Sequence, residues 1–299
     1  MTIAAVVVRW RGGEEVARCL RSLVDHGPDR VVLVDSGSGD GGASSLATRF
    51  PEVEVIELEE NRSFAWAASR GAEAAPDADV LLLNPDTEVM TGAVDRLAAT
   101  LRHHPEAAGM APLLVDRDGR PQHRWQLRRL PGVARLALGL PGAPAFPGPA
   151  PSAPAPVPQP AAAAWLLRRE VWDRLDGLDP AFVPAWWEDV DLCARLAVGL
   201  GEPGFPAAAG FVVEPSATVV HSGGGSARRL GSEAFLLVYH RNLIRYAARH
   251  HPKALGPIRA GVAAACVVRA ATRPGRRRAY LRCAREVVRG SEHRLTARD

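Results

Sequence analysis

Apolar and polar positions alternate along the first third of the chain in a way that predicts buried strands joined by amphipathic helices. The runs Ile3–Val8 and Val31–Val34 are continuously apolar and rich in β-branched residues, as in strands covered on both faces. Residues 14–26, between them, carry apolar side chains at helical spacing and begin with two acids. This strand–helix–strand order predicts a parallel sheet with right-handed crossovers.

The same kinds of element are predicted further along the chain. Additional strands are expected at Val53–Leu58, Ala78–Leu83, Ala162–Leu167 and Ala217–Val220. Additional helices are expected at Phe64–Ala75, Thr91–His103, Arg169–Leu175, about 188–199, 234–250, Ala260–Ala271 and Arg276–Arg289. The pattern as a whole predicts an α/β fold whose C-terminal part is a helical extension.

One tract interrupts this pattern. Leu140–Pro160 consists mainly of proline, alanine and glycine, which offer little apolar surface to bury. We therefore expect a flexible or polyproline-like excursion inserted into the domain.

Composition narrows the class of protein. A chain of 299 residues with 47% apolar residues can form one large domain or two small ones. No amino-terminal signal is recognised, and no apolar run is expected to approach the ~20 residues that a spanning helix needs. The four cysteines lack CxxC spacing, which argues against a disulfide framework or a zinc site. We expect a reduced, cytoplasmic protein.

The positive charge is concentrated near the C-terminus. The net charge is only +4, yet nine arginines lie between Arg269 and Arg294, against two glutamates. The basic, amphipathic segment Arg276–Arg289 suits an anionic membrane surface or a lipid-linked phosphate, and a solvated helical tail is the alternative. Aromatic residues are sparse there and no nucleic-acid-binding motif is present, so no nucleic-acid partner is expected.

The stretch Leu81–Val89 (LLLNPDTEV) places an acid at the end of a buried strand. Pro85 stops the strand because it lacks a backbone donor, and Asp86 then lies where open α/β sheets bind their ligands. A carboxylate held there can bind a divalent cation, and the cation can bind a diphosphate. The alternative is an ordinary turn in which Asp86 and Thr87 cap the next helix.

A glycine-rich segment, Asp35–Gly42 (DSGSGDGG), follows the second predicted strand. Its glycines permit close approach of the backbone to a ligand, and its Ser and Asp side chains can bind sugar or base edges. It is neither a Walker A loop nor a GxGxxG fingerprint. A tight turn capped by Asp40 is the alternative.

A second acidic cluster lies in the run FVPAWWEDVDLCARLAVG. Glu188, Asp189 and Asp191 fall in the first turn of a helix, where the helix dipole favours anions, and an arginine follows Asp191 four residues on. Helix electrostatics is therefore one interpretation. The preceding Trp186 and Trp187 favour another, because indole faces stack on sugar rings and a nearby carboxylate can remove a hydroxyl proton.

Two further stretches carry candidate ligands. His221 ends a predicted strand beside small residues and is a candidate metal ligand, with a structural histidine as the alternative. Gln122–Arg129 (QHRWQLRR) mixes basic and aromatic groups that hold a phosphate or form a solvated edge.

Five motifs, taken in order, carry a family resemblance. They are VVLVDSGSGDGG, ENRSFAWAASRG, LLLNPDTEV, WWEDVDLCARL and HSGGGS, within the span from Ile3 to His251. In this order they resemble the family 2 glycosyltransferases (hexosyltransferases), particularly bacterial rhamnosyltransferase-like members. The resemblance implies a GT-A fold, in which a Rossmann-like nucleotide half with a mostly parallel sheet joins an acceptor half. It also implies inverting transfer of a sugar from a nucleoside diphosphate sugar.

The resemblance assigns the donor side of the site. Nucleotide and donor binding is implied for Asp35, Ser36, Gly37, Ser38, Asp40, Asn61, Asn84 and Asp86. Asp35 matches the position that holds the base or ribose, and Asn84 stands in place of the first acid of a DxD motif. Asp86 matches the residue at the metal and diphosphate, with His221 assisting, and the implied metal is Mg²⁺ or Mn²⁺.

The acceptor side is assigned in the same way. Asp189 matches the catalytic base, with Glu188 beside it, and Trp186 and Trp187 are candidates for acceptor binding. One departure from the family pattern is the end of the first strand, which reads RWRG at residues 9–12 where a Thr-Tyr/Phe-Asn type of ending is usual.

The implied organisation is a glycosyltransferase domain over residues 1–225 and a basic helical extension over residues 226–299. The domain divides into a nucleotide half (about 1–115) and an acceptor half (about 116–225), with the proline-rich insertion at about 140–160. The implied partners are a nucleoside diphosphate sugar, with dTDP-rhamnose as the candidate, and a glycan or lipid-linked acceptor of polysaccharide biosynthesis.

Such a protein would be cytoplasmic and peripheral at the inner membrane face. Two other functions stay open on the residues alone: a sugar nucleotidyltransferase, and a non-catalytic protein that binds sugars or lipid head groups.

Overall fold

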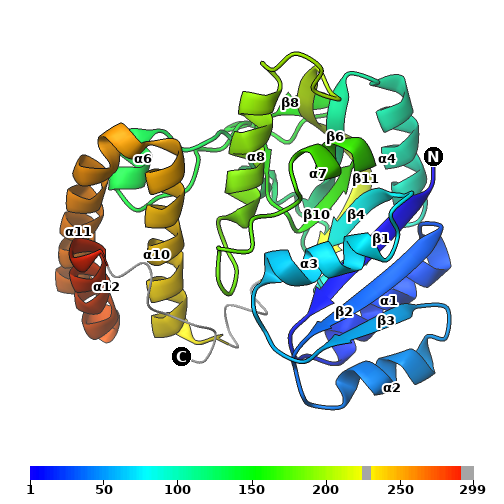
Figure 1. The fold of residues 1–299 in the computed structure, drawn as a ribbon, viewed down its shortest axis with the longest axis horizontal. Helices are drawn as coiled ribbons and strands as arrows, with labels where there is room; N and C mark the ends of the chain where they lie inside the picture. Colours follow the sequence, from blue (N-terminus) through cyan, green and yellow to red (C-terminus); the bar gives the residue numbers. More distant parts are fainter. Residues whose placement is uncertain (224–229, 291–299) are drawn as a thin grey trace.

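The computed structural model describes residues 1–223 and 230–290, and Figure 1 shows how their helices and strands are arranged. Residues 224–229 and 291–299 lie outside this description, and with them the end of the HSGGGS motif and Arg294 of the arginine-rich tail. The described residues form a mixed sheet of nine strands with helices on both faces, followed by a group of C-terminal helices.

The first half of the sheet is parallel, as the sequence predicts. It consists of β1 (Ile3–Arg9), β2 (Arg30–Ser36), β3 (Glu54–Leu58) and β4 (Asp79–Leu83), in the spatial order β3-β2-β1-β4. The residues of β1, β2 and β4 are almost all buried, which agrees with their unbroken apolar runs.

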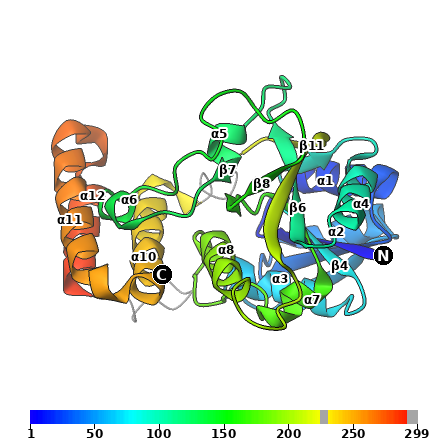
Figure 2. The ribbon, with the colours of Figure 1, turned by 90° about the horizontal axis from the view of Figure 1, so that it is seen from above.

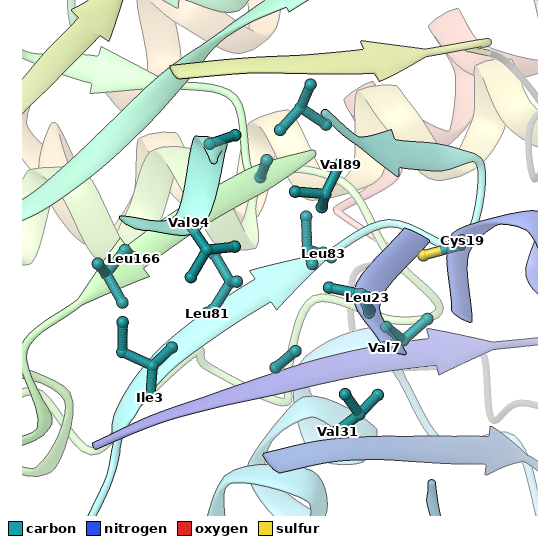
Figure 3. Packing of buried hydrophobic residues seen from close by; sticks show 14 of the residues in the cluster. Ile3, Val7, Cys19, Leu23, Val31, Leu81, Leu83, Val89, Val94 and Leu166 are labelled. Carbon is teal, nitrogen blue, oxygen red and sulfur yellow. The ribbon is translucent and has the colours of Figure 1, made fainter. Parts of the chain in front are cut away.

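The helices of this half cover both faces of the sheet. They are α1 (Glu14–His26), α2 (Gly42–Arg49), α3 (Phe64–Glu73) and α4 (Ala93–His103). One core cluster joins α1, α2 and α4 to the sheet, and the other joins α3 to its opposite face. Figure 3 shows part of the first cluster, where Val7 and Leu83 of neighbouring strands lie beside Leu23 of α1.

The second half of the sheet contains antiparallel strands. β10 (Ala164–Leu167) lies between β4 and β6 (Ala107–Val115) and is antiparallel to both. β11 (Ala209–His221) runs parallel to β6, and the short strands β5 (Thr87–Val89) and β8 (Ala155–Val157) pair antiparallel with β11. The sequence pattern predicts only a part of β11 and does not predict β6, because the run AAGMAP is made of small residues that carry little strand signal.

Part of the proline-rich tract is regular, contrary to the prediction. Its strand β8 pairs with β11, and β9 (Gln159–Pro160) pairs with β7 (Leu127–Arg128) in a second, two-stranded sheet. Val157 and Gln159 are buried. The expectation of a flexible excursion is therefore wrong for residues 155–160. Proline is compatible with such short edge strands because few of their backbone donors enter a ladder.

Four further helices of the described residues precede the C-terminal group. They are α5 (His123–Gln126), α6 (Val133–Ala137), α7 (Arg169–Arg174) and α8 (Glu188–Gly199). Helix α8 is buried on two sides. Leu192 and Leu196 pack in the core cluster on the α3 face of the sheet, and Val190 and Ala194 pack against the C-terminal helices. It therefore links the two parts of the molecule.

The C-terminal extension is helical, as predicted. It contains α10 (Ser232–His250), α11 (Leu255–Thr272) and α12 (Arg277–Arg289), joined by short 3₁₀ turns at Pro252–Ala254 and Pro274–Arg276. These helices share a core of their own with α6, and Figures 1 and 2 show the group lying beside α8.

One helical segment bears on the expectation that no apolar run approaches the length of a membrane span. The 21 residues Pro252–Thr272 form a helical segment that is, by length and composition alone, apolar enough to cross a membrane. Arg259 and Arg269 interrupt the apolar run, which is why the sequence pattern misses it. One face of the segment, with Val262 and Cys266, packs in the helical core.

Candidate active site

A single cavity of about 530 Å³ brings together three of the acidic residues singled out in the sequence: Asp86, Glu188 and Asp189. Those of the predicted site residues that line it are Asn84, Asp86, Trp186, Trp187, Glu188, Asp189 and His221. Asp86 follows β4, and Asp189 lies in the first turn of α8. The two carboxylates thus come from segments far apart in the sequence and share one cavity.

Asp86 is positioned by the end of the sheet. After Pro85, the chain enters β5, whose Thr87 pairs with His221 at the end of β11. The backbone of Ser222 donates to the Asp86 carbonyl at 3.0 Å. As a result, Asp86 Oδ1 lies 3.6 Å from His221 Nε2. The alternative in which Asp86 caps the next helix is not what the structure shows, because α4 begins at Ala93 after Gly92.

The orientation of His221 is set by Gln122. The Gln122 amide donates to the His221 carbonyl at 2.8 Å, so its oxygen faces His221 Nδ1 at 2.9 Å and accepts a hydrogen bond from it. Nε2 is then the nitrogen with the lone pair, and it points toward Asp86. Burial lowers the pKa of His221, while the nearby Asp86 charge acts in the opposite direction.

An indole ring completes this side of the cavity. Trp125 stacks on His221 with ring centroids 5.2 Å apart and planes 13° from parallel. Gln122 and Trp125 come from the QHRWQLRR stretch, whose basic and aromatic character drew attention, yet no pattern in the sequence links them to His221.

The donor set at Asp86 fits a divalent cation that also binds substrate. A carboxylate is an ordinary ligand for Mg²⁺ or Mn²⁺, a neutral imidazole suits a transition-metal ion such as Mn²⁺ better than Mg²⁺, and Mg²⁺ in particular is commonly held by few protein ligands together with substrate phosphates. Within residues 1–223 and 230–290, no group of three or more His, Cys, Asp or Glu side chains is arranged to hold a metal. A cation here would therefore depend on oxygen ligands from the substrate.

The loop before α8 carries the second carboxylate. Trp186 and Trp187 have φ angles of +73° and +79°, in the left-handed region that side chains other than glycine rarely adopt. Asn242 of α10, which is fully buried, donates to the carbonyl oxygens of Ala185 at 2.9 Å and Trp186 at 3.1 Å. The strained loop is thus held by a residue of the C-terminal helices that the sequence analysis did not single out.

The two tryptophans differ in how much surface they leave open. Trp187 is buried, with its ring packed against Tyr239 at 5.5 Å and Tyr246 at 5.3 Å. Trp186 is half-buried and packs edge-on against Phe235 at 4.9 Å. Trp186 therefore offers the larger ring surface to a ligand.

Glu188 and Asp189 lie in different environments. Asp189 is near two donors, Arg128 and Gln159. Glu188 is buried, and its Oε2 has no hydrogen-bond partner among the described residues. Burial raises the pKa of Glu188 well above its usual range, and the charge of Asp189 raises it further. The pair is thus divided into a buried carboxyl that favours its protonated form and a carboxylate supplied with hydrogen-bond donors.

Asp191 has a structural role. It is fully buried and accepts from Arg195 at 2.7 Å, which confirms the predicted pairing four residues apart, and it also contacts His250 of α10 at 2.7 Å. This buried network ties α8 to the C-terminal helices.

The glycine-rich segment forms a second group of predicted residues, which do not line the cavity. The buried Arg9 forms an ion pair with Asp35, and its Nη2 contacts Asp40 at 2.9 Å. The Ser38 amide donates to Asp35 at 2.7 Å, and Asp40 accepts from the Gly42 amide at 2.9 Å. Arg9 thus holds together the ends of β1 and β2 and the loop between β2 and α2.

The other members of this group are packed against the segment before α3. Ser36 donates to the Asn61 side-chain oxygen at 3.0 Å. Gly37 has a φ of +62°, and a Cβ atom there would come within 2.5 Å of the Glu60 carbonyl carbon. A glycine is therefore required at this position by both conformation and space.

Comparison with known proteins identifies the family of this chain. The model for the family described as "Glycosyl transferase family 2" matches residues 5–173, which is more than half of the chain. The chain belongs to this family and is a glycosyltransferase.

The chain is similar to the N-acetylglucosaminyl-diphospho-decaprenol L-rhamnosyltransferase of Mycobacterium tuberculosis, in two strains. The sequences are 27% identical over 271 residues, covering 83% of this chain and 85% of the relative. The protein is therefore rhamnosyltransferase-like.

Solved structures confirm the GT-A fold. A mannosyltransferase from Pyrobaculum calidifontis in complex with GDP-Man and Mn²⁺ aligns with a TM-score of 0.59, at 17% identity, over 97% of this chain and 88% of that chain. GalNAc-T7 with UDP, GalNAc and Mn²⁺ aligns with a TM-score of 0.58, at 18% identity, over 85% of this chain and 51% of that chain.

The buried Glu188 makes stability depend on pH. Because the pKa of Glu188 is raised in the folded state, its contribution to stability is intact below the ordinary value of 4.5 and is lost as the pH rises toward the folded-state pKa. We expect Glu188→Gln to melt near the wild-type temperature at about pH 4.5 and above it at pH 8, since an amide needs no ionisation. Calorimetric melting at both pH values tests this. A variant that melts lower than the wild type at pH 8 would contradict it.

Proposed function

We propose that the protein is an inverting rhamnosyltransferase that uses dTDP-rhamnose and a lipid-linked acceptor. The observation that carries this proposal is the single cavity shared by Asp86 and Asp189. A donor diphosphate at Asp86 and an acceptor hydroxyl at Asp189 would then lie on opposite sides of one transferred sugar. The name of the mycobacterial relative supplies the sugar and the acceptor class.

The diphosphate side of the cavity is assigned to Asp86, His221 and a divalent cation. Bound there, Mg²⁺ or Mn²⁺ would offset the negative charge that develops on the departing nucleoside diphosphate. The chain's own contribution is the Asp86 carboxylate and the His221 Nε2 lone pair, which Gln122 keeps pointed toward the site. The Mn²⁺ in the two solved neighbours supports a divalent metal.

The acceptor side is assigned to Asp189 as general base. An alcohol is a poor nucleophile near neutral pH, and Asp189 would remove its proton as the new glycosidic bond forms, an effect typically of roughly 10²–10⁴-fold. Attack from the face opposite the departing diphosphate is a single displacement and inverts the anomeric carbon. Trp186, with the more open ring, is assigned to acceptor stacking.

The nucleoside is assigned to the glycine-rich segment. Asp35 and its neighbours lie at the carboxyl ends of β1 and β2, where open parallel sheets bind nucleotides. The nucleotide half is accordingly assigned to about residues 1–115, and the acceptor half to about residues 116–225.

The base assignment predicts a loss of turnover without a loss of binding. Asp189→Asn keeps the shape of the side chain but cannot accept the proton, so kcat should fall by roughly 10²–10⁴-fold. The affinity for dTDP-rhamnose should remain close to that of the wild type. Transfer of labelled rhamnose to an N-acetylglucosaminyl diphosphate lipid gives the rate, and calorimetry gives the affinity. Wild-type turnover in this variant would remove Asp189 from the role.

The metal assignment predicts a loss of metal-dependent binding. In Asp86→Ala the cation loses its carboxylate, so addition of Mn²⁺ should no longer raise the affinity for dTDP. Titration calorimetry with and without Mn²⁺ measures the difference, and Asp118→Ala, an exposed acid outside the cavity, serves as the control. An equal Mn²⁺ effect in both variants would count against the assignment.

The helical extension is assigned to a membrane surface, which places the protein peripherally at the cytoplasmic face. Val267 and Val268 of α11 and Val288 of α12 are 52%, 61% and 68% exposed. Exposed arginines accompany them on α12 and the turn before it: Arg276, Arg277, Arg278, Arg282, Arg285 and Arg289. Apolar and cationic side chains together suit the interface of an anionic bilayer.

This assignment predicts binding to anionic vesicles that weakens with salt. The full chain should sediment with phosphatidylglycerol-containing vesicles and not with pure phosphatidylcholine, because each arginine near an anionic surface contributes about 1 kcal/mol. Arg277→Glu with Arg278→Glu should reduce sedimentation, and Arg49→Glu, an exposed arginine at the end of α2, should not. Equal sedimentation with both lipids would refute the surface.

A further inference from the structure

The small second sheet brings two donors to one oxygen atom. In the β7–β9 pair, Arg128 lies directly opposite Gln159. Arg128 Nη2 lies 3.5 Å from Asp189 Oδ2, and Gln159 Nε2 donates to the same oxygen at 3.2 Å. Since neighbouring positions across an antiparallel pair project from the same face, the ribbon presents the two side chains together.

The contact is sheltered from solvent. Gln159 is fully buried, and the side chains of Arg128 and Asp189 are only 12% and 14% exposed. The other carboxylate oxygen, Oδ1, accepts from the Val190 amide at 2.8 Å. Both oxygens of Asp189 are thus engaged by the protein, and the carboxylate plane is fixed from two directions.

The charges around the cavity give Arg128 a particular importance. Among the described residues that line the cavity, Asp86, Glu188 and Asp189 are carboxylic acids, and Arg128 is the guanidinium. A charge on Asp189 beside buried Glu188 is unfavourable unless it is compensated. The guanidinium is placed to compensate it, while Gln159 fixes the oxygen without adding charge.

We propose that Arg128 and Gln159 are positioning residues for Asp189, which together hold its carboxylate in the orientation needed to receive the acceptor proton. This inference rests on the proposed function of Asp189 as base. It gives the ordered end of the proline-rich tract a role, because Gln159 is supplied by that tract. Neither residue is assigned a contact with the donor.

The test compares variants that keep size but remove the donors. Arg128→Met and Gln159→Met should each lower kcat between about tenfold and about 10²-fold, the cost of a misplaced catalytic group. The KM and the calorimetric Kd for dTDP-rhamnose should stay within about twofold of the wild-type values. Arg174→Met is the matched control. It removes an exposed arginine of α7 that pairs with Glu202, and it should keep wild-type kinetics.

Two further measurements separate positioning from a merely structural role. In an Asp189→Asn background, Arg128→Met should cause no additional loss of kcat, because its effect passes through the missing carboxylate. Added guanidinium ion should partly restore kcat in Arg128→Ala and should leave Gln159→Met unchanged. Melting temperatures of all variants report whether each has folded.

The outcomes separate this inference from the proposed function. Rhamnose transfer by the wild type, with loss in Asp189→Asn, establishes the proposed function independently of the positioning role of Arg128 and Gln159. Wild-type kcat in both Arg128→Met and Gln159→Met would overturn the positioning role. A large rise in the Kd for dTDP-rhamnose in Arg128→Met would also overturn it, because Arg128 would then be a phosphate ligand. An additional loss of kcat when Arg128→Met is combined with Asp189→Asn would overturn it as well.

Discussion

The site depends on how the start of α8 is held. Two consecutive tryptophans with positive φ store strain of about 1–3 kcal/mol each, and such a backbone persists only where its surroundings fix it. The Asn242 amide provides that constraint through its bonds to the loop carbonyls, and the buried Asp191 network adds a second tie between α8 and α10. Because both ties come from α10, the C-terminal helices help to hold the cavity wall that carries Asp189.

Much of the fold is predictable because burial leaves a plain signature. Strands β1, β2 and β4 are covered on both faces, and their sequences are therefore continuously apolar. Strand β6 is equally buried, but its first six residues, AAGMAP, are mainly alanine, glycine and proline, which carry little strand signature; a Cβ atom at Gly109 would lie 2.5 Å from the Leu166 carbonyl oxygen. The short strands β8 and β9 are not predicted for a similar reason, because prolines in a sequence usually indicate loops.

The candidate site likewise contains residues that the sequence predicts and residues that it does not. Asp86, Asp189 and His221 lie in local motifs, and the sequence alone is enough to propose each of them as a site residue. Arg128, Gln159 and Asn242 act through contacts between residues 30 to 61 positions apart, which no local pattern encodes. Arg9 is visible only as a departure from the family pattern, and its pairing with Asp35 and Asp40 explains how a charged residue is accommodated there.

The region matched by the family model ends at residue 173, before α8 and α10 contribute their wall of the cavity. Asn84, Asp86 and the glycine-rich segment precede that boundary, whereas Asp189, His221 and Tyr239 follow it. On the proposed assignment, the metal and diphosphate residues lie on both sides of this boundary, whereas Asp189 and Trp186 both lie beyond it. Substitutions in α10, which supplies Phe235 and Tyr239 to the cavity, would therefore reshape the proposed acceptor wall while Asp86 and the glycine-rich segment stay as they are.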